Sequence, residues 1–136
     1  MVAQLVKADG SVQVTRKDNM IVNAGFDFIA NSIGATEDRP AVMKGIGVGT
    51  GTDSVKETDR ALIKPLLYKA ATFSHLSSTK VFTFKTRFEA GEATGAITEA
   101  AVMTGNGGTL LDRVTFPVIN KAADDQLSIT FTFTMA

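Results

Sequence analysis

The sequence predicts a mainly β fold, an antiparallel β-sandwich with a jelly-roll-like arrangement and one short helix. The clearest signal is the stretch 126–135, where apolar and hydroxyl-bearing side chains alternate with a period of two. Only a β-strand places every second side chain on one face. Roughly seven or eight strands are expected, with turn signals every ~8–12 residues, which is typical of a sandwich or a jelly roll. The chain has 136 residues, of which 44% are hydrophobic, and this suits a single domain covering 1–136.

The first part of the chain is predicted to contain short extended runs. Residues 1–10 lack a strong core pattern and fit either an N-terminal arm or an edge strand. After the turn signal Asp9-Gly10, the alternation in 11–15 predicts a strand, and residues 20–22 resume an extended run.

One helix is predicted over residues 24–33. Asn23 is a candidate N-cap, and Gly34 is a natural stop. Apolar residues recur between them at helical spacing, so the helix is expected to pack by one face. That face consists of Phe26, Ile29, Ala30 and Ile33.

The remaining strands are predicted from apolar runs and from alternation. They cover 42–48, 61–67, 81–88, 97–104, 110–118 and the C-terminal stretch already described. Pro65 cannot donate a ladder hydrogen bond, so it places its strand at an edge or at a bulge. Residues 106–108 (Asn-Gly-Gly) predict a tight hairpin turn. In the strand 110–118, Arg113 is expected on the face opposite Val114, and the segment 69–78 carries no decided pattern.

Composition excludes several classes of function. Fourteen basic residues balance fourteen acidic ones, so no cationic excess favours nucleic acid as the main partner. The chain has no cysteine, which excludes disulfides, thiolate metal sites and cysteine nucleophiles. No stretch approaches the ~18–20 apolar residues of a membrane span, and the first residues lack the pattern of a signal peptide. The protein is therefore expected to be made in the cytoplasm, without a membrane partner.

No catalytic, cofactor-binding or metal-binding residue is predicted. The glycine-rich run 45–51 has neither the spacing nor the following helix of a nucleotide-binding loop, so its glycines are expected to let another backbone approach closely or to let the strand bulge. His75 is the only histidine and has no neighbouring nucleophile, so it is expected to be a surface residue. Glu92 and Glu99 are expected to be solvated or interface charges rather than a catalytic pair.

The polar loop 49–59 is the main candidate for contact with another protein. It lacks the aspartate spacing of a calcium loop, and loops of this length in small domains are usually functional. The N-terminal segment is the second candidate, since a terminus not tied to its own domain is free to reach a neighbour. The candidate interface residues are Thr50, Thr52, Asp53, Lys56, Glu57 and Asp59 in the loop, with Gln4 and Lys7 in the N-terminal segment.

Four stretches resemble small structural proteins of tailed bacteriophages, in particular capsid decoration (cement) proteins. They are 21–30 (IVNAGFDFIA), 46–52 (IGVGTGT), 88–100 (FEAGEATGAITEA) and 108–121 (GTLLDRVTFPVINK). They combine strand and turn signatures and contain no catalytic motif. The resemblance runs from about residue 21 to the end of the chain.

The resemblance implies a non-enzymatic virion protein that binds the outside of the phage head. The implied partners are the major capsid protein and further copies of the chain, as a homodimer or homotrimer, and the implied location is the capsid exterior. A small tail or baseplate component is the alternative, which copy number would separate from cement. A carbohydrate-binding module is less favoured, because the chain has no tryptophan and a single tyrosine on which a sugar could stack.

Overall fold

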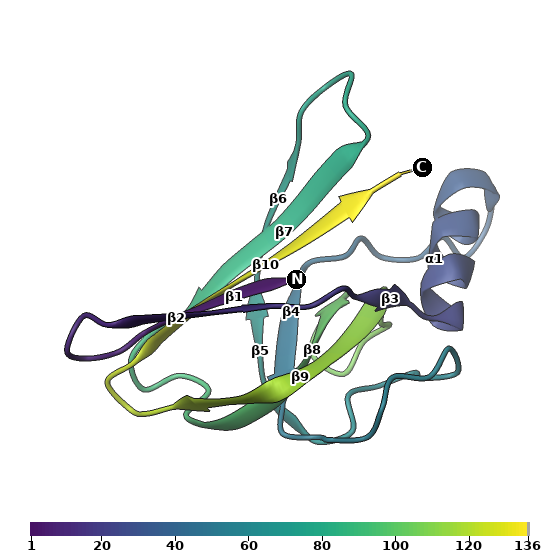
Figure 1. Cartoon of the computed structure of the whole chain (residues 1–136). Helices are drawn as coiled ribbons and strands as arrows, with labels where there is room; N and C mark the ends of the chain where they lie inside the picture. The colour runs from purple at the N-terminus through teal and green to yellow at the C-terminus, as the bar shows by residue number, and fades with distance from the viewer. Residues whose placement is uncertain (136) are drawn as a thin grey trace.

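The computed structural model describes residues 1–135 and consists of two five-stranded sheets and one helix (Figure 1). Sheet A has the strand order β2-β1-β10-β7-β6, and sheet B has the order β3-β9-β8-β4-β5. The strands are β1 Val2–Val6, β2 Val12–Arg16, β3 Met20–Ile21, β4 Gly45–Gly49, β5 Pro65–Ala70, β6 Thr72–His75, β7 Val81–Phe88, β8 Gly95–Met103, β9 Asp112–Lys121 and β10 Gln126–Thr134. The helix is α1 Asn23–Gly34.

All neighbouring strands are antiparallel, which confirms the predicted β-sandwich with one short helix. The jelly-roll connectivity stays a prediction. Within residues 1–135, no helix has the length and apolar character needed to cross a membrane.

Strand β10 is the middle strand of sheet A and behaves as the alternation predicts. It pairs with β1 on one side and with β7 on the other. Leu127, Ile129 and Phe131 are fully buried between the sheets. The hydroxyl-bearing residues between them face outward and are exposed or half-buried. Strand β7 follows the same rule, with Phe84 and Phe88 on the buried face.

The N-terminal segment is neither a free arm nor an edge strand, so this part of the sequence analysis is wrong. Strand β1 lies inside sheet A between β2 and β10, and β2 is the edge strand. Ala3 and Leu5 are buried in the core. The short alternation Ala3, Leu5 was too brief to reveal this placement. Deleting residues 1–8 would therefore remove an internal strand rather than a detachable extension.

Helix α1 covers the predicted residues but differs in its cap and its packed face. The N-cap residue is Val22, which has no side chain that can bond to the helix amides, instead of Asn23. Phe28 and Ile29 pack against the core, whereas Phe26 and Ile33 are exposed. The buried Gly25 sets this orientation, because a Cβ there would collide with the backbone carbonyl of Leu111.

The glycine-rich run forms β4, which lies between β8 and β5 in sheet B and whose residues are all buried. At Gly45 and Gly49 a Cβ would collide with the backbone oxygens of Lys69 and Lys64 in the neighbouring chain segment. The expected close backbone approach is therefore confirmed. Strand β5 is the edge of sheet B, and the register shifts where Gly49 meets Pro65, as the proline predicts.

Candidate functional site

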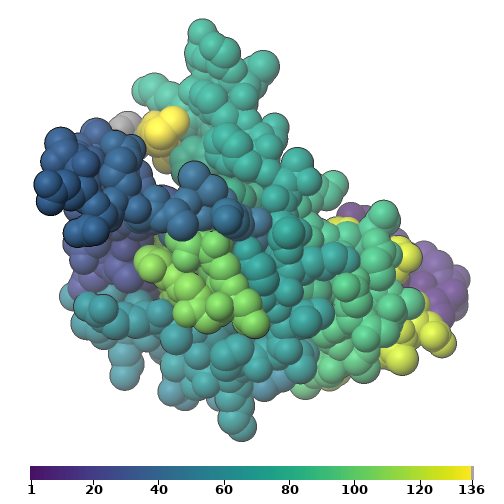
Figure 2. All heavy atoms as spheres, turned by 180° about the vertical axis from the view of Figure 1, so that it is seen from behind, coloured from purple at the N-terminus to yellow at the C-terminus, as the bar shows by residue number. Residues whose placement is uncertain are grey.

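One end of the sandwich is open because sheet A extends beyond sheet B. The hairpin of β6 and β7 and the end of β10 project past the other sheet, and α1 stands opposite them (Figure 1). The space-filling view from behind shows the hairpin as a ridge that rises from the rest of the molecule (Figure 2). The inward face of this projecting part has no partner strand, so its apolar side chains border a groove.

The groove between the hairpin and α1 has a volume of ≈ 730 Å³. Its walls come from α1, the segment 39–43, strands β6 and β7, and the end of the chain described. Its lining is mostly apolar and comprises Phe28, Ile29, Ser32, Arg39, Pro40, Val42, Met43, Phe73, His75, Phe82, Phe84, Leu111 and Met135.

A cluster of phenylalanine rings forms the sheet side of the groove. The ring centroids of Phe73 and Phe84 are 5.3 Å apart, and those of Phe82 and Phe133 are 5.0 Å apart. Phe131 continues the cluster into the core, with its centroid 6.3 Å from that of Phe133. These separations lie in the range of favourable aromatic contacts, so the rings form one packed surface.

Several large apolar side chains around the groove are exposed to solvent instead of being buried in the core. Phe73 is 58% exposed, Val42 65%, Leu76 73% and Met135 50%. Single exposed apolar residues are normal, but a contiguous group around a concavity marks an interaction site. The groove is therefore the strongest candidate for a binding surface in the described part of the chain.

The polar groups at the groove serve the local structure. The Arg39 guanidinium donates hydrogen bonds to the carbonyl oxygens of Ser32 and Ala35 at the end of α1. The Nδ1 atom of His75 lies 2.8 Å from the carbonyl oxygen of Val81, and the side chain is exposed, as the sequence predicts. This geometry offers an apolar slot with Arg39 and His75 at its border.

The loop 50–64 covers the outer face of sheet B over a buried ion pair, and we call this region the closed end of the molecule. Arg113 and Glu99 are both fully buried, with Nε and Oε2 2.9 Å apart. Glu99 also accepts backbone hydrogen bonds from Gly51, Ile63 and Lys64 at 2.8–3.1 Å. These contacts satisfy the carboxylate and hold both ends of the loop against sheet B.

The guanidinium of Arg113 holds the middle of the same loop. It donates to Asp59 Oδ2 at 2.9 Å and to the carbonyl oxygen of Asp53 at 3.0 Å. The expectation that Glu99 is a solvated or interface charge is therefore wrong. Arg113 does lie opposite the core residue Val114, but the loop covers that face and buries it.

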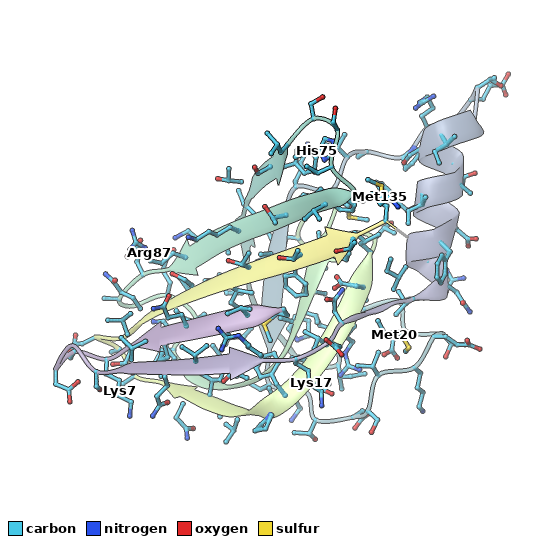
Figure 3. All side chains as sticks on the ribbon, turned by 45° about the horizontal axis from the view of Figure 1, so that its top comes forward. Lys7, Lys17, Met20, His75, Arg87 and Met135 are labelled. Atoms are coloured by element: carbon cyan, nitrogen blue, oxygen red, sulfur yellow. The ribbon has the colours of Figure 1, made fainter. Side chains whose placement is uncertain are left out.

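The structure separates the candidate interface residues rather than bringing them together. Lys7 lies at the turn of the β1–β2 hairpin, far from the loop 50–64 (Figure 3). Gln4 faces outward in the middle of sheet A, between Val14 and Ser128. In the loop, Thr52, Lys56 and Glu57 have exposed side chains, whereas Asp59 is committed to Arg113.

The backbone of the loop is also committed to the domain. The amide of Thr50 donates to Lys64, the carbonyl of Glu57 accepts from Asn23, and Asp53 accepts from Arg113. Replacing 52–58 by a flexible linker would disturb the carbonyl acceptors at Asp53 and Ser54 that the buried guanidinium uses. The loop is long because it covers a buried charge. The sequence of the loop did not indicate this role.

A further buried carboxyl lies near the start of β9. Asp112 is completely buried, and its Oδ1 accepts a hydrogen bond from the Val102 amide at 3.0 Å. Its Oδ2 has no hydrogen-bond partner among the described residues. Burial raises the pKa of Asp112 to about 7. No group of three or more histidine or acidic side chains within residues 1–135 could hold a metal ion.

Sequence reasoning missed the groove because its parts look unrelated along the chain. Two of them, Phe73 and His75, lie in the segment 69–78 for which no structure was predicted. The apolar residues of that polar-looking segment were the only available signal. Comparison of the chain with protein-family models, with curated proteins and with solved structures finds no match in any of the three.

Proposed function

We propose that the protein is a non-enzymatic structural component of a tailed-phage particle. In this proposal it is a capsid decoration protein, which binds the outside of the head as dimers or trimers and links major capsid subunits. The observation that supports an assembly role best is the apolar groove at the open end of the sandwich. The resemblance of the four sequence stretches supports the phage particle as its location.

The groove favours a protein partner for energetic reasons. Covering apolar surface contributes about 25 cal/mol per Å², so burying the exposed side chains of Phe73 and Val42 against a neighbouring subunit would be favourable. Aromatic residues in partly formed pockets are also the usual centres of binding energy at interfaces. The walls come mainly from two strands, a helix and the segment 39–43, which gives the slot a fixed shape before it is filled.

A decoration protein gains further from repetition. Copies bound to a shell present the same surface many times, so weak contacts add through effective concentration. A formal net charge of zero keeps repulsion between neighbouring copies low. Both features fit a small rigid module that is used in large numbers.

The test locates the protein on particles of the phage that encodes it. Electron cryomicroscopy and gel quantification of purified particles should find the chain on the head, in a copy number comparable to that of the capsid subunit. A few copies at the tail or baseplate would replace this proposal by the alternative one. Absence from particles would refute both.

The role of the groove is tested by variants in reconstitution on shells that lack the protein. Phe73→Ser and Val42→Ser should weaken binding or self-association. The matched control is Val118→Ser, which removes a similarly exposed apolar side chain on β9, away from the groove. Equal binding by all three folded variants would remove the groove from the interface.

A further inference from the structure

The outer face of sheet A is a second surface that the fold leaves uncovered. It faces the viewer in Figure 3, with sheet B behind it. The register places the outward side chains of β2, β1, β10, β7 and β6 on one continuous surface. These side chains are Val12, Val14, Arg16, Val2, Gln4, Val6, Gln126, Ser128, Thr130, Thr132, Thr134, Val81, Thr83, Lys85, Arg87, Thr72 and Ser74.

Charge on this face has a single sign. Among the outward strand residues in the described chain, Arg16, Lys85 and Arg87 are basic and none is acidic. The whole chain carries no net charge, so the acidic residues that balance these cations lie on other parts of the molecule. A flat face with cations and no anions is electrostatically complementary to an acidic surface.

The register shows how the cations are spaced. Arg16, Val2, Thr130 and Lys85 form one cross-strand row. Neighbouring strands lie about 4.8 Å apart, so Arg16 and Lys85 stand roughly 14 Å from each other across the sheet. Arg87 follows Lys85 by two residues, but its Nε is paired with Glu89 at 2.9 Å. Within residues 1–135, neither Arg16 nor Lys85 has an ion-pair partner.

A shallow depression beside Lys85 could receive a carboxylate. It has a volume of ≈ 420 Å³, and its border includes Lys85 and the hydroxyl-bearing Thr72 and Ser128. Lys69, Arg87 and Glu89 also border it, but the ammonium group of Lys69 is held by Glu92, and Arg87 and Glu89 pair with each other. Lys85 is therefore the cation that remains for an incoming acidic group, and the two hydroxyls could donate further hydrogen bonds.

The other half of the face is apolar and would add contact area. Val2, Val12 and Val14 are exposed on β1 and β2, next to Arg16. No aromatic residue faces outward from these strands, so nucleic-acid bases would find nothing on which to stack. The combination of valines, hydroxyls and two separated cations fits a protein surface better than a polynucleotide.

We propose that the outer face of sheet A docks an acidic protein surface, whose carboxylates pair with Arg16 and Lys85. The identity of that partner as the capsid shell rests on the function proposed above, whereas its acidic chemistry does not. The face and the groove are then separate contact surfaces of one module, one electrostatic and one apolar.

The test compares two double charge reversals with equal changes in net charge. R16E/K85E alters the face, and K44E/K64E alters exposed lysines outside it. Binding to shells that lack the protein is measured between about 50 and about 500 mM salt. Wild type should weaken as salt rises, R16E/K85E should bind about tenfold more weakly at low salt, and K44E/K64E should stay within about twofold of wild type.

Several results would overturn the proposal. One is equal binding by the two double variants, both folded by circular dichroism. Displacement of wild type from shells by duplex DNA would point to nucleic acid instead. Loss of self-association in R16E/K85E alone, measured by light scattering, would make a second copy of the chain the occupant.

A second probe separates this inference from the proposed function. If wild type does not bind shells at all, the proposed function fails, and immobilised poly-glutamate then tests the face by itself. Retention of wild type and K44E/K64E, with loss of R16E/K85E, supports an acidic partner. Equal retention of the three proteins overturns it.

Discussion

The closed end and the open end of the molecule differ in the side chains that they bury: one buries charges, and the other leaves apolar groups exposed. At the closed end, a polar loop covers the fully buried Arg113 and Glu99, and each charge finds several partners. At the open end, phenylalanine rings border a groove and stay partly exposed. Polar composition thus marks the sealed part of the molecule and apolar composition the accessible part. The comparison separates the side chains that stabilise the fold from those that are available to a partner.

The largest effect is expected at the closed end. Glu99→Ala leaves the Arg113 guanidinium buried without its carboxylate and leaves the amides of Gly51, Ile63 and Lys64 without their acceptor. Breaking a buried ion pair by removing one partner costs about 3–5 kcal/mol. A urea titration should show this loss in the free energy of unfolding. The control, Glu92→Ala, removes a partly exposed pair with Lys69 and should cost much less; equal losses would contradict the account of the closed end.

An effect of similar size is expected in the core. Phe131→Ala should cost about 3–5 kcal/mol, because the ring is fully buried and its removal leaves a cavity. Thr132→Ala, on the exposed face of the same strand, should cost well under half as much. The measurement is the denaturant midpoint of each purified variant. Similar midpoints would refute the alternation of β10.

The third prediction concerns pH and Asp112. Burial raises the pKa of this carboxyl to about 7, so the folded state holds a proton that the unfolded chain releases near pH 4. Between these values the folded state binds more protons, and the free energy of unfolding should therefore fall as pH rises, by a few kcal/mol in total. Asp112→Asn should lose this slope between about pH 4 and pH 8. A variant that keeps the slope would assign it to other groups.

The smallest effect on stability is expected at the open end. Phe73→Ser should change the free energy of unfolding by only about 1 kcal/mol or less, because the ring is mostly exposed. The same variant should clearly weaken assembly, which sharpens the contrast with Glu99→Ala. Thermal unfolding of the monomer and reconstitution on shells measure the two quantities. A large loss of stability with normal assembly would make the open end part of the core.

The sequence was sufficient to predict an element where the periodicity and the residue types of one segment indicate the same structure. The alternation of 126–135, the strand 81–88 and the effect of Pro65 all describe a segment that carries its own signal. It was insufficient where burial depends on a distant segment. Glu99 and Arg113 looked like surface charges because the loop that covers them lies about 40 to 60 residues away along the chain. The groove could not be predicted for the same reason, since six separate segments line it.

The pairing of β1 with β10 has a consequence for how the chain folds. Sheet A is completed only when 126–134 inserts between the hairpin of β1 and β2 and the hairpin of β6 and β7. Contacts between segments so far apart in sequence are slow to form, because a long loop must close before they contribute. During synthesis both hairpins therefore carry an open edge until the last strand leaves the ribosome. Premature pairing of those edges between chains is the misfolding route that this topology invites.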